Sequence, residues 1–373
     1  MTSDVFFDNI QQQFNSQQPF VVYRKPKSEK VKALLQNSDT IYSVKNFTET
    51  GFVFAPFDDT KETVLIPLEN SRILRIDNII LNKSEESHNI SANNYTLDKN
   101  NHLDLVSKGI TAISNSRLKK VVLSRTETAQ LSDSNPIENY KRLLNKYKLA
   151  FVYCWFHPKV GLWIGATPET FLKVSGNRFT TMALAGTQKY QETLDVQWSD
   201  KDKDEQQFVS DFILNSLKDL TDNMHLSEIK TIRAGNLLHL CTNVSGIFKK
   251  NVSNLKSILK ILHPTPAVCG LPKSLAKQFI LDNENYNREF YTGFLGELNL
   301  RNEHSPRSSK RNIEDRAYSV TKINSQLFVN LRCMQLTDSE AQIYIGGGIT
   351  KDSNADDEWQ ETINKSLVMK NIL

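Results

Sequence analysis

Two acidic side chains and a lysine lie on one face of the last helix that the sequence predicts. In DDEWQETINKSLVM the helical period places Glu358, Glu361 and Lys365 within one arc of about 100°. Three consecutive glycines, Gly346–Gly348, precede this helix at the end of a strand, where they would let a ligand approach the backbone. A glycine turn followed by a carboxylate-bearing helix could hold a metal ion and an anion side by side. The commoner alternative is a solvated face with a Glu361–Lys365 ion pair, which contributes a few tenths of a kcal/mol.

A further carboxylate, Glu205, borders the apolar stripe of a helix predicted to start after Ser199. A carboxylate in such a place needs a partner or a raised pKa. The partner is either a neighbour on the same helix, Lys201 or Lys203, or a group from elsewhere. Clusters of carboxylate oxygens suit magnesium. The seven histidines show no HxH or HExxH spacing, which argues against zinc.

Four other polar residues lie at the edges of apolar runs or within them. Lys120 opens the strand-like KVVLSR and Glu169 closes the turn GATPE, and each alone is typical of a surface charge. His263, in HPTPAVCG, is typical of a capping or core-edge residue. Arg332 lies in the middle of LFVNLRCMQL, which we expect to be one strand. An arginine in an apolar strand is rarely unpaired, so we expect an anionic partner for it.

Composition and charge exclude several classes of protein. A chain of 373 residues with 39% apolar residues can bury a large core, as one big domain or two intimately joined ones. The net charge of +4 comes from interspersed charges, which gives no footprint for nucleic acid. The four cysteines form no CxxC pair, which favours reduced thiols over disulfides or zinc. Neither a signal peptide nor a membrane-length apolar run is present, so we expect a cytoplasmic protein without membrane contacts.

The predicted elements combine many strands with several helices. Three strand-like runs, 41–47, 51–57 and 62–68, precede a polar stretch at 82–101, a helix at about 102–117, a strand at 119–125, and two hairpins within 151–187. Helices are predicted after Ser199 and at the last apolar stripe, with two shorter helices between them and with strands at HLCTNVSGIF, GFLGELNL and LFVNLRCMQL. The polar segment 301–325 is predicted to be a long surface excursion. The fold class is therefore α+β.

The order of these motifs resembles the chorismate-utilising enzymes, which include isochorismate, salicylate, anthranilate and aminodeoxychorismate synthases. The matching stretches are KVVLSR, GATPE, ALAGT, DKDKDEQQFV, HPTPAVCGLP, FYTGFLGELN, LFVNLRC, GGGIT and EWQETINKS. Residues 1–100 match only loosely, 102–373 carry the motifs, and 301–325 has the character of an insertion. The resemblance implies one chorismate-binding enzyme domain over residues 1–373, with large antiparallel sheets flanked by helices.

The resemblance also implies roles for individual residues. Lys120 matches the general base that acts on water, and Glu169 matches the general acid that protonates the departing hydroxyl. Glu205, Glu358 and Glu361 match the carboxylates around a Mg²⁺ ion, which is the cofactor we expect. Positions implied to contact the substrate are Gly186, Thr187, His263, Ala267, Tyr291, Arg332, Gly346, Gly348 and Lys365, of which Tyr291 and Arg332 match residues that hold the enolpyruvyl carboxylate. One departure is Gln206, where many relatives carry histidine.

Three positions favour the isochorismate synthase branch of this family. Aminodeoxychorismate synthases usually have a lysine where this chain has Ala185, anthranilate synthases usually lack a lysine at the position of Lys120, and salicylate synthases tend to carry threonine at Ala267. The expected reaction adds water at C2 of chorismate and releases the C4 hydroxyl, reversibly. It requires a neutral Lys120 and a protonated Glu169, and desolvation should raise the pKa of Glu169.

Two alternatives remain from the sequence: a salicylate synthase, which would also eliminate pyruvate, and a non-catalytic chorismate-binding protein. The expected partner is the small molecule chorismate, with no nucleic acid, membrane or obligatory protein partner. Menaquinone, siderophore and salicylate synthesis are equally compatible destinations for the product.

Overall fold

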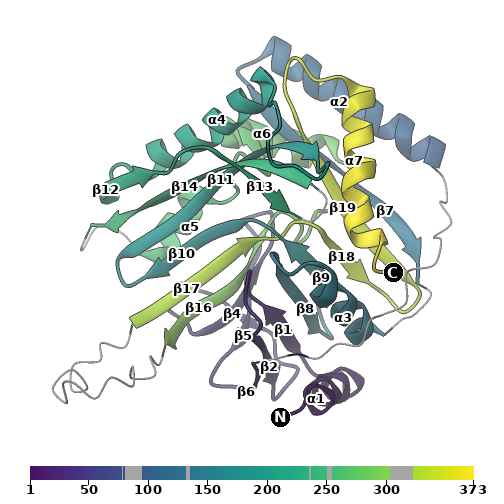
Figure 1. Ribbon diagram of the computed structural model, residues 1–373, viewed down its shortest axis with the longest axis vertical. Coiled ribbons are helices and arrows are strands. Elements are labelled where there is room, and N and C mark those ends of the chain that lie inside the picture. Colours follow the sequence, from purple (N-terminus) through teal and green to yellow (C-terminus); the bar gives the residue numbers. More distant parts are fainter. Residues whose placement is uncertain (78, 80–94, 132–134, 235–236, 250–253, 303–321) are drawn as a thin grey trace.

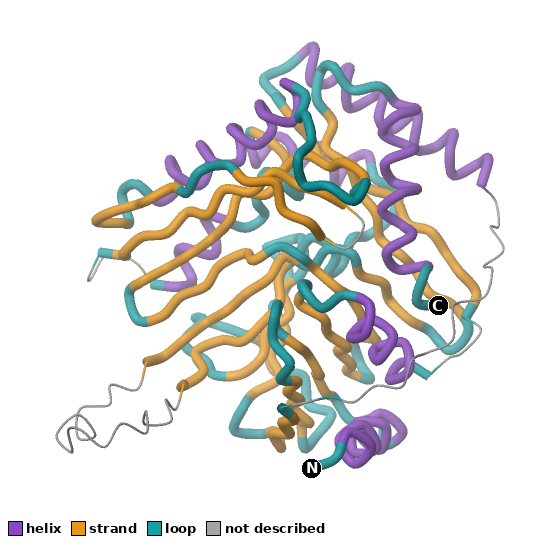
Figure 2. The backbone as a smooth tube through the Cα atoms, viewed as in Figure 1, coloured by secondary structure: helices purple, strands orange, loops and turns teal. Residues whose placement is uncertain are grey.

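Strands dominate the molecule, and helices lie at its periphery (Figures 1 and 2). The computed structural model describes residues 1–77, 79, 95–131, 135–234, 237–249, 254–302 and 322–373. Within them the strands form two large sheets, and every strand pair of these sheets is antiparallel. The predicted α+β class is confirmed.

The first sheet has nine strands, in the order β15 (Gly270–Leu271), β7 (Lys120–Gln130), β19 (Glu340–Ile349), β18 (Cys333–Leu336), β9 (Gly161–Thr167), β8 (Phe151–His157), β1 (Phe20–Arg24), β2 (Val31–Gln36) and β6 (Ser71–Ile76). The second has ten, in the order β12 (Thr221–Leu226), β14 (Leu237–Phe248), β11 (Arg178–Lys189), β10 (Thr170–Ser175), β17 (Lys322–Val329), β16 (Phe294–Asn302), β4 (Gly51–Ala55), β5 (Val64–Pro67) and β3 (Tyr42–Ser43). An additional strand, β13 (Lys230–Ala234), pairs with β14. The helices are α1 (Ser3–Asn15), α2 (Tyr95–Asn115), α3 (Pro136–Lys146), α4 (Asp200–Leu217), α5 (Leu255–Leu262), α6 (Lys273–Asn283) and α7 (Ala355–Lys370).

Strand β8 shows how the layers arise. Its side chains alternate between two faces, as the period of an extended chain requires. Tyr153 and Trp155 belong to a largely aromatic core that both sheets share, with Phe54 and Phe328 from the second sheet. The intervening side chains, such as Cys154, pack in a separate core with α1, α3 and α7. Because both faces are covered, the strand is buried along its whole length and is largely apolar.

The two helices that matter for the site begin with clear signals. Ser199 caps α4 in a reciprocal capping box with Asp202. Asn354 caps α7, whose first turn carries three acidic residues that suit the positive end of the helix dipole. Helix α4 packs on β11 and β14 of the second sheet, whereas α7 packs on β19 of the first. None of the helices formed by described residues is long and apolar enough to cross a membrane.

The structure corrects three of the expected boundaries. The helix predicted at about 102–117 begins at Tyr95 and ends at Asn115, so the last part of the polar stretch 82–101 is helical. The single strand expected at LFVNLRCMQL is two strands, β17 and β18, which belong to different sheets. Both edges of the segment 301–325 continue β16 and β17, and residues 303–321 lie outside the described part.

Candidate functional site

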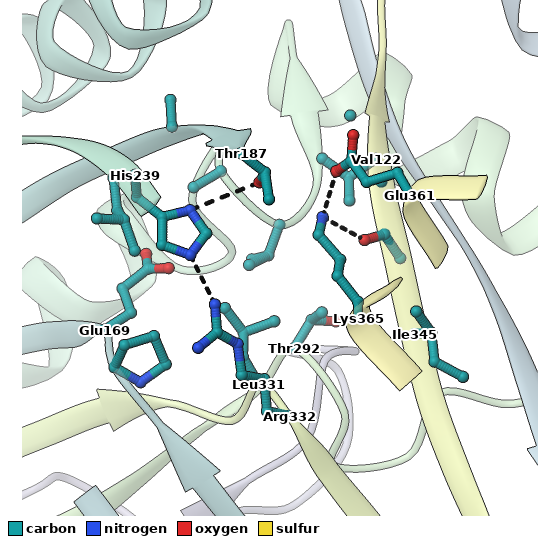
Figure 3. A pocket seen from close by; sticks show the side chains of 18 of the residues that line it. Val122, Glu169, Thr187, His239, Thr292, Leu331, Arg332, Ile345, Glu361 and Lys365 are labelled. Atoms are coloured by element: carbon teal, nitrogen blue, oxygen red, sulfur yellow. Dashed lines mark hydrogen bonds and ion pairs between the residues drawn. The ribbon is translucent and has the colours of Figure 1, made fainter. Parts of the chain in front are cut away.

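A pocket lies where the two sheets meet the helices α4 and α7. Strands β7 and β19 of the first sheet and β11 and β14 of the second contribute to its lining. Two chain crossings between the sheets complete it, the GATPE turn between β9 and β10 and the link between β17 and β18. Figure 3 shows Glu169, His239 and Arg332 on one side, and Glu361 and Lys365 across from them. The pocket therefore collects charged groups from strands, crossings and helices that are remote in sequence.

Arg332 lies at the crossing from β17 to β18, not inside a strand. Its backbone has φ +49°, an uncommon value for a residue with a side chain. This turn of the backbone ends β17 and directs the guanidinium into the pocket, which explains why the expected continuous strand is interrupted. Burial lowers the pKa of Arg332 to about 10, opposed by Tyr147 and Glu169. The group stays cationic at neutral pH.

His239 on β14 orients this arginine. Its Nε2 lies 2.6 Å from Nη2 of Arg332, and its Nδ1 lies 2.8 Å from the carbonyl oxygen of Gly186. Burial, together with the charge of Arg332, lowers the pKa of His239 to about 3. A neutral ring that donates from Nδ1 to Gly186 and accepts at Nε2 from Arg332 satisfies both contacts.

The environment of Glu169 favours the protonated form of its carboxyl group. It is buried directly before the start of β10. Burial raises its pKa to about 8, although the charges of Lys120 and Arg332 act in the opposite direction. The expected direction of this pKa shift is confirmed. A protonated carboxyl group that lines a pocket can donate a proton to a leaving group.

Lys120 lies one layer behind the pocket. It is fully buried, and its Nζ donates to Oε1 of Glu205 at 2.6 Å. Burial tends to raise the pKa of Glu205, but the ammonium of Lys120, helped by Lys365 and Lys201, holds it below its ordinary value. The partner of Glu205 is therefore a long-range one, whereas Lys201 pairs with Glu358 and Lys203 with Asp200. Gly348 makes room for this pair, because a Cβ there would lie 3.1 Å from Cε of Lys120 and 3.0 Å from Oε1 of Glu205.

Three carboxylates meet at two adjacent glycines of β19. A Cβ on Gly347 would lie 3.2 Å from Oε2 of Glu358 and 3.9 Å from Oε1 of Glu361, while Glu205 faces Gly348. Oε2 of Glu358 is buried and lacks a hydrogen-bond partner among the described residues. Burial, with the neighbouring carboxylate of Glu361, raises the pKa of Glu358. An orphaned oxygen and a second anion beside it are what a hard divalent cation would relieve, so these residues fit Mg²⁺.

Each of the three carboxylates also contacts a lysine. Lys120 pairs with Glu205, Lys201 with Glu358 at 2.8 Å, and Lys365 with Glu361 at 2.6 Å. In the described ranges no group of three acidic, histidine or cysteine side chains is arranged closely enough to hold a metal ion as it stands. The cofactor thus stays a prediction. The Glu361–Lys365 pair is present, yet Lys365 also donates to the carbonyl oxygen of Gly346 at 2.9 Å, so it is not only a solvated surface contact.

The structure brings most of the predicted site residues together. Eleven of the fourteen line the pocket: Glu169, Gly186, Thr187, Glu205, Ala267, Tyr291, Arg332, Gly346, Gly348, Glu361 and Lys365. Lys120 and Glu358 stand directly behind this lining, through their contacts with Glu205 and Gly347. The roles proposed for these residues remain predictions.

His263 is the exception, and the expectation that it contacts the substrate is not supported by its position. It caps the end of α5, is buried between Phe171 and Phe294, and its Nε2 lies 3.0 Å from the carbonyl oxygen of Pro56. The residues that line the pocket from the same turn are Ala267 and Val268. The motif HPTPAVCG reaches the site through its second half, and its histidine anchors the first half in the core.

Sequence reasoning missed several polar residues of the pocket, among them Lys201 and His239. Lys201 precedes Glu205 by four positions, a spacing that we interpreted as a possible local pair, whereas its partner Glu358 comes from α7. His239 alternates with leucines in LLHLCT and gave no separate signal. The departure at Gln206 has a structural explanation. This buried amide donates to the carbonyl oxygen of Ala183 and to Oγ1 of Thr242, and so fastens α4 to β11 and β14.

Comparison with known proteins identifies the class to which this fold and site belong. Residues 45–304 match the model of the "Chorismate binding enzyme" family, and residues 319–371 match a second model described as "chorismate binding enzyme". The first match covers well over half of the chain. The chain belongs to the chorismate-binding enzyme family.

Curated relatives include several isochorismate synthases. The chain is 27% identical to isochorismate synthase EntC of Escherichia coli K12 over 282 residues, which are 72% of this chain and 66% of that protein, just under two thirds. It is 24% identical to isochorismate synthase DhbC of Bacillus subtilis, over 84% of this chain and 78% of that protein. Anthranilate synthase component 1 of Lactococcus lactis is 24% identical over 80% of this chain and 64% of that protein.

Solved structures of this family have the same fold. The menaquinone-specific isochorismate synthase MenF of Escherichia coli superposes with a TM-score of 0.73 at 19% identity, covering 95% of this chain and 88% of that one. A putative 2,3-dihydroxybenzoate-specific isochorismate synthase of Bacillus anthracis, DhbC, gives a TM-score of 0.75 at 21% identity, covering 97% and 98%.

Proposed function

We propose that the protein is an isochorismate synthase, which adds water at C2 of chorismate and releases the C4 hydroxyl. The observation that carries the proposal is the combination of two groups. One is the buried Glu169, whose pKa of about 8 keeps it protonated, and the other is the buried Lys120, which is paired with Glu205 behind Gly348. The charge of Lys120 acts on Glu169, so the two groups serve one site. The isochorismate synthases among the relatives support the same conclusion.

Glu169 would act as the general acid. Expulsion of a hydroxyl from C4 requires a proton on the departing oxygen, since hydroxide is a poor leaving group. Glu169 lines the pocket and holds its proton at neutral pH, so it can deliver that proton as the C–O bond breaks. The resulting carboxylate would lie near the cations Lys120 and Arg332, whose charges act on it.

Lys120 would act as the general base on the attacking water. Its ammonium already donates to Glu205, which provides an acceptor for one of its protons. In the neutral form, the amine nitrogen could take a proton from water at the face of the ring next to Gly348, where glycine leaves the way open. A Cβ at position 348 would lie 3.1 Å from Cε of Lys120, so a side chain there would crowd the amine.

The two carboxylates of chorismate would bind to cationic groups on opposite sides of the pocket. Arg332, oriented by His239, and Tyr291 would hold the enolpyruvyl carboxylate. Lys365 stands across the pocket beside Glu361 (Figure 3). There Glu205, Glu358 and Glu361 would hold Mg²⁺, which when bound would neutralise the ring carboxylate.

Two small residues favour this reaction over others in the family. Ala185 and Ala267 both line the pocket. Their positions are the ones at which the motifs of aminodeoxychorismate and salicylate synthases differ from this sequence. They leave the pocket without a lysine at position 185 and without a hydroxyl at position 267. The lysine would provide a nucleophile, and the hydroxyl would add a polar contact to the substrate.

The test is to incubate the purified protein with chorismate and MgCl₂ and to identify the products by chromatography and NMR. We expect isochorismate and chorismate in a mixture that is reached from either compound. Salicylate with pyruvate as the main product would establish the salicylate synthase alternative. Chorismate binding in calorimetry without any conversion would establish the non-catalytic binding protein.

A further inference from the structure

Two strained turns flank the carboxylate-binding end of the pocket. Thr292 has φ +60°, which is rare for a β-branched residue, and Arg332 has φ +49°. Thr292 follows Tyr291, and both line the pocket, as does Arg332. Backbone conformations of this kind persist only where surrounding contacts enforce them, and they concentrate at functional sites.

Asn330 joins these two turns. It is fully buried in the crossing between β17 and β18, two residues before Arg332. Its backbone accepts from the amide of Thr292 at 2.9 Å and donates to the carbonyl oxygen of Gly293 at 2.8 Å. Its side-chain Nδ2 donates to the carbonyl oxygen of Phe290 at 2.9 Å. The residue therefore contacts the peptide groups on both sides of Tyr291.

The orientation of the Asn330 amide is fixed by a third element. Oδ1 accepts from the hydroxyl of Tyr153 on β8 at 2.6 Å, so the Nδ2 end must face Phe290. Tyr153 is itself fully buried in the core that both sheets share. Asn330 thus ties the Tyr291 turn and the Arg332 crossing to the rigid centre of the fold.

We propose that Asn330 is a positioning residue that sets the placement of Tyr291 relative to Arg332, and thereby the affinity for the carboxylate held between them. The inference rests on the proposed function of those two residues as a carboxylate clamp. Asn330 does not itself line the pocket, so it acts through them. Loss of its amide releases Phe290 and leaves the hydroxyl of Tyr153 without its acceptor, while the backbone bonds to Thr292 and Gly293 remain possible.

The test compares Asn330→Ala with wild type in KM, kcat and thermal unfolding. The positioning role predicts a KM for chorismate about 10-fold higher, with kcat within about 3-fold, because a misplaced clamp weakens binding more than chemistry. Tyr153→Phe keeps the ring and removes only the hydroxyl, so it should raise KM by about 3-fold. This milder variant decides the matter if Asn330→Ala does not fold.

Asn139→Ala is the matched control, because Asn139 is equally buried but lies on α3 and is absent from the pocket lining. General destabilisation lowers the active fraction, and with it the apparent kcat, without changing KM. The inference is overturned if KM in Asn330→Ala and Tyr153→Phe stays within twofold of wild type, or rises equally in Asn139→Ala. If the wild type binds chorismate without converting it, the proposed function alone is rejected. The dissociation constants of the variants for chorismate, measured by calorimetry, then give the same comparison as KM. If the wild type neither binds nor converts chorismate, both proposals fail.

Discussion

Glu169→Gln tests whether the pocket keeps a carboxyl group protonated for catalysis. The side chain is 3% exposed, and burial raises its pKa from an ordinary 4.5 to about 8. At pH 7 about 90% of the groups then carry the proton, against about 0.3% for an ordinary glutamate, so the acid form is enriched roughly 300-fold. Glutamine keeps the shape but cannot donate that proton to a leaving oxygen. Turnover should fall by about 100-fold or more, and chorismate binding should stay within about 3-fold.

The same substitution has a consequence for stability that does not depend on activity. The folded protein retains the Glu169 proton up to a pH of about 8, whereas the unfolded chain releases it above about 4.5. The wild type therefore loses stability as the pH rises through this window, and the loss is complete above pH 8. Between pH 6 and pH 9 the contribution amounts to roughly 2–3 kcal/mol. Glutamine has no proton to lose, so the variant should gain that much relative to wild type.

Urea denaturation at pH 6 and pH 9 measures this difference, and initial rates over the same range give the matching kinetic profile. We expect kcat of the wild type to fall as the pH rises through about 8, because Glu169 loses its proton there. Equal pH dependence of stability in wild type and variant, together with full activity of Glu169→Gln, would refute the assignment of a buried, protonated acid.

Three further predictions concern the base, the arginine and the metal site. Lys120→Ala should reduce kcat by about 100-fold or more while chorismate still binds. The control Lys119→Ala, at the neighbouring exposed lysine, should leave kcat unchanged. Normal turnover in Lys120→Ala would show that this lysine is not the base. Arg332→Lys should raise KM by about 10-fold or more, because an ammonium cannot form the planar two-pronged contact with a carboxylate, and an unchanged KM would place the arginine outside the clamp. Glu358→Gln should increase by about 10-fold the magnesium concentration needed for half-maximal chorismate binding, measured by calorimetry. The control Glu340→Gln, at an exposed glutamate, should leave this concentration unchanged. The same magnesium requirement in both variants would show that Glu358 holds no metal.

The predictable parts of the fold are those that depend on local pattern. Helix α4 starts at its capping box and carries a regular apolar stripe that is buried, and the hairpins of 151–187 turn at glycine and asparagine. Both features follow from neighbours in sequence, so a single chain is enough to find them. The link KPKSEK between the N-terminal strands β1 and β2 has no glycine or asparagine. Strand β1 is buried along its whole length and β2 everywhere except at Lys32, so neither gave a clear alternation to detect.

The parts of the site that could not be predicted depend on distant contacts. Lys120 and Glu205 are 85 positions apart, and Lys201 and Glu358 are 157 apart, so no spacing rule connects them. Their meeting depends on how α4 and α7 converge over β19. Arg332 illustrates the opposite failure, because an apolar run predicted one strand where the chain changes sheets. The positive φ that redirects it has no signature in the residue type.

The most direct test of the proposed reaction is to run it in H₂¹⁸O with chorismate and MgCl₂ and to analyse the isochorismate by mass spectrometry and NMR. Water activated by Lys120 and a hydroxyl expelled with the proton of Glu169 predict one ¹⁸O atom in the product, at the new C2 hydroxyl. The reverse reaction should slowly introduce the label into the C4 hydroxyl of the remaining chorismate. Isochorismate without label would contradict the attack of solvent water, and a failure to form isochorismate would contradict the proposed activity itself.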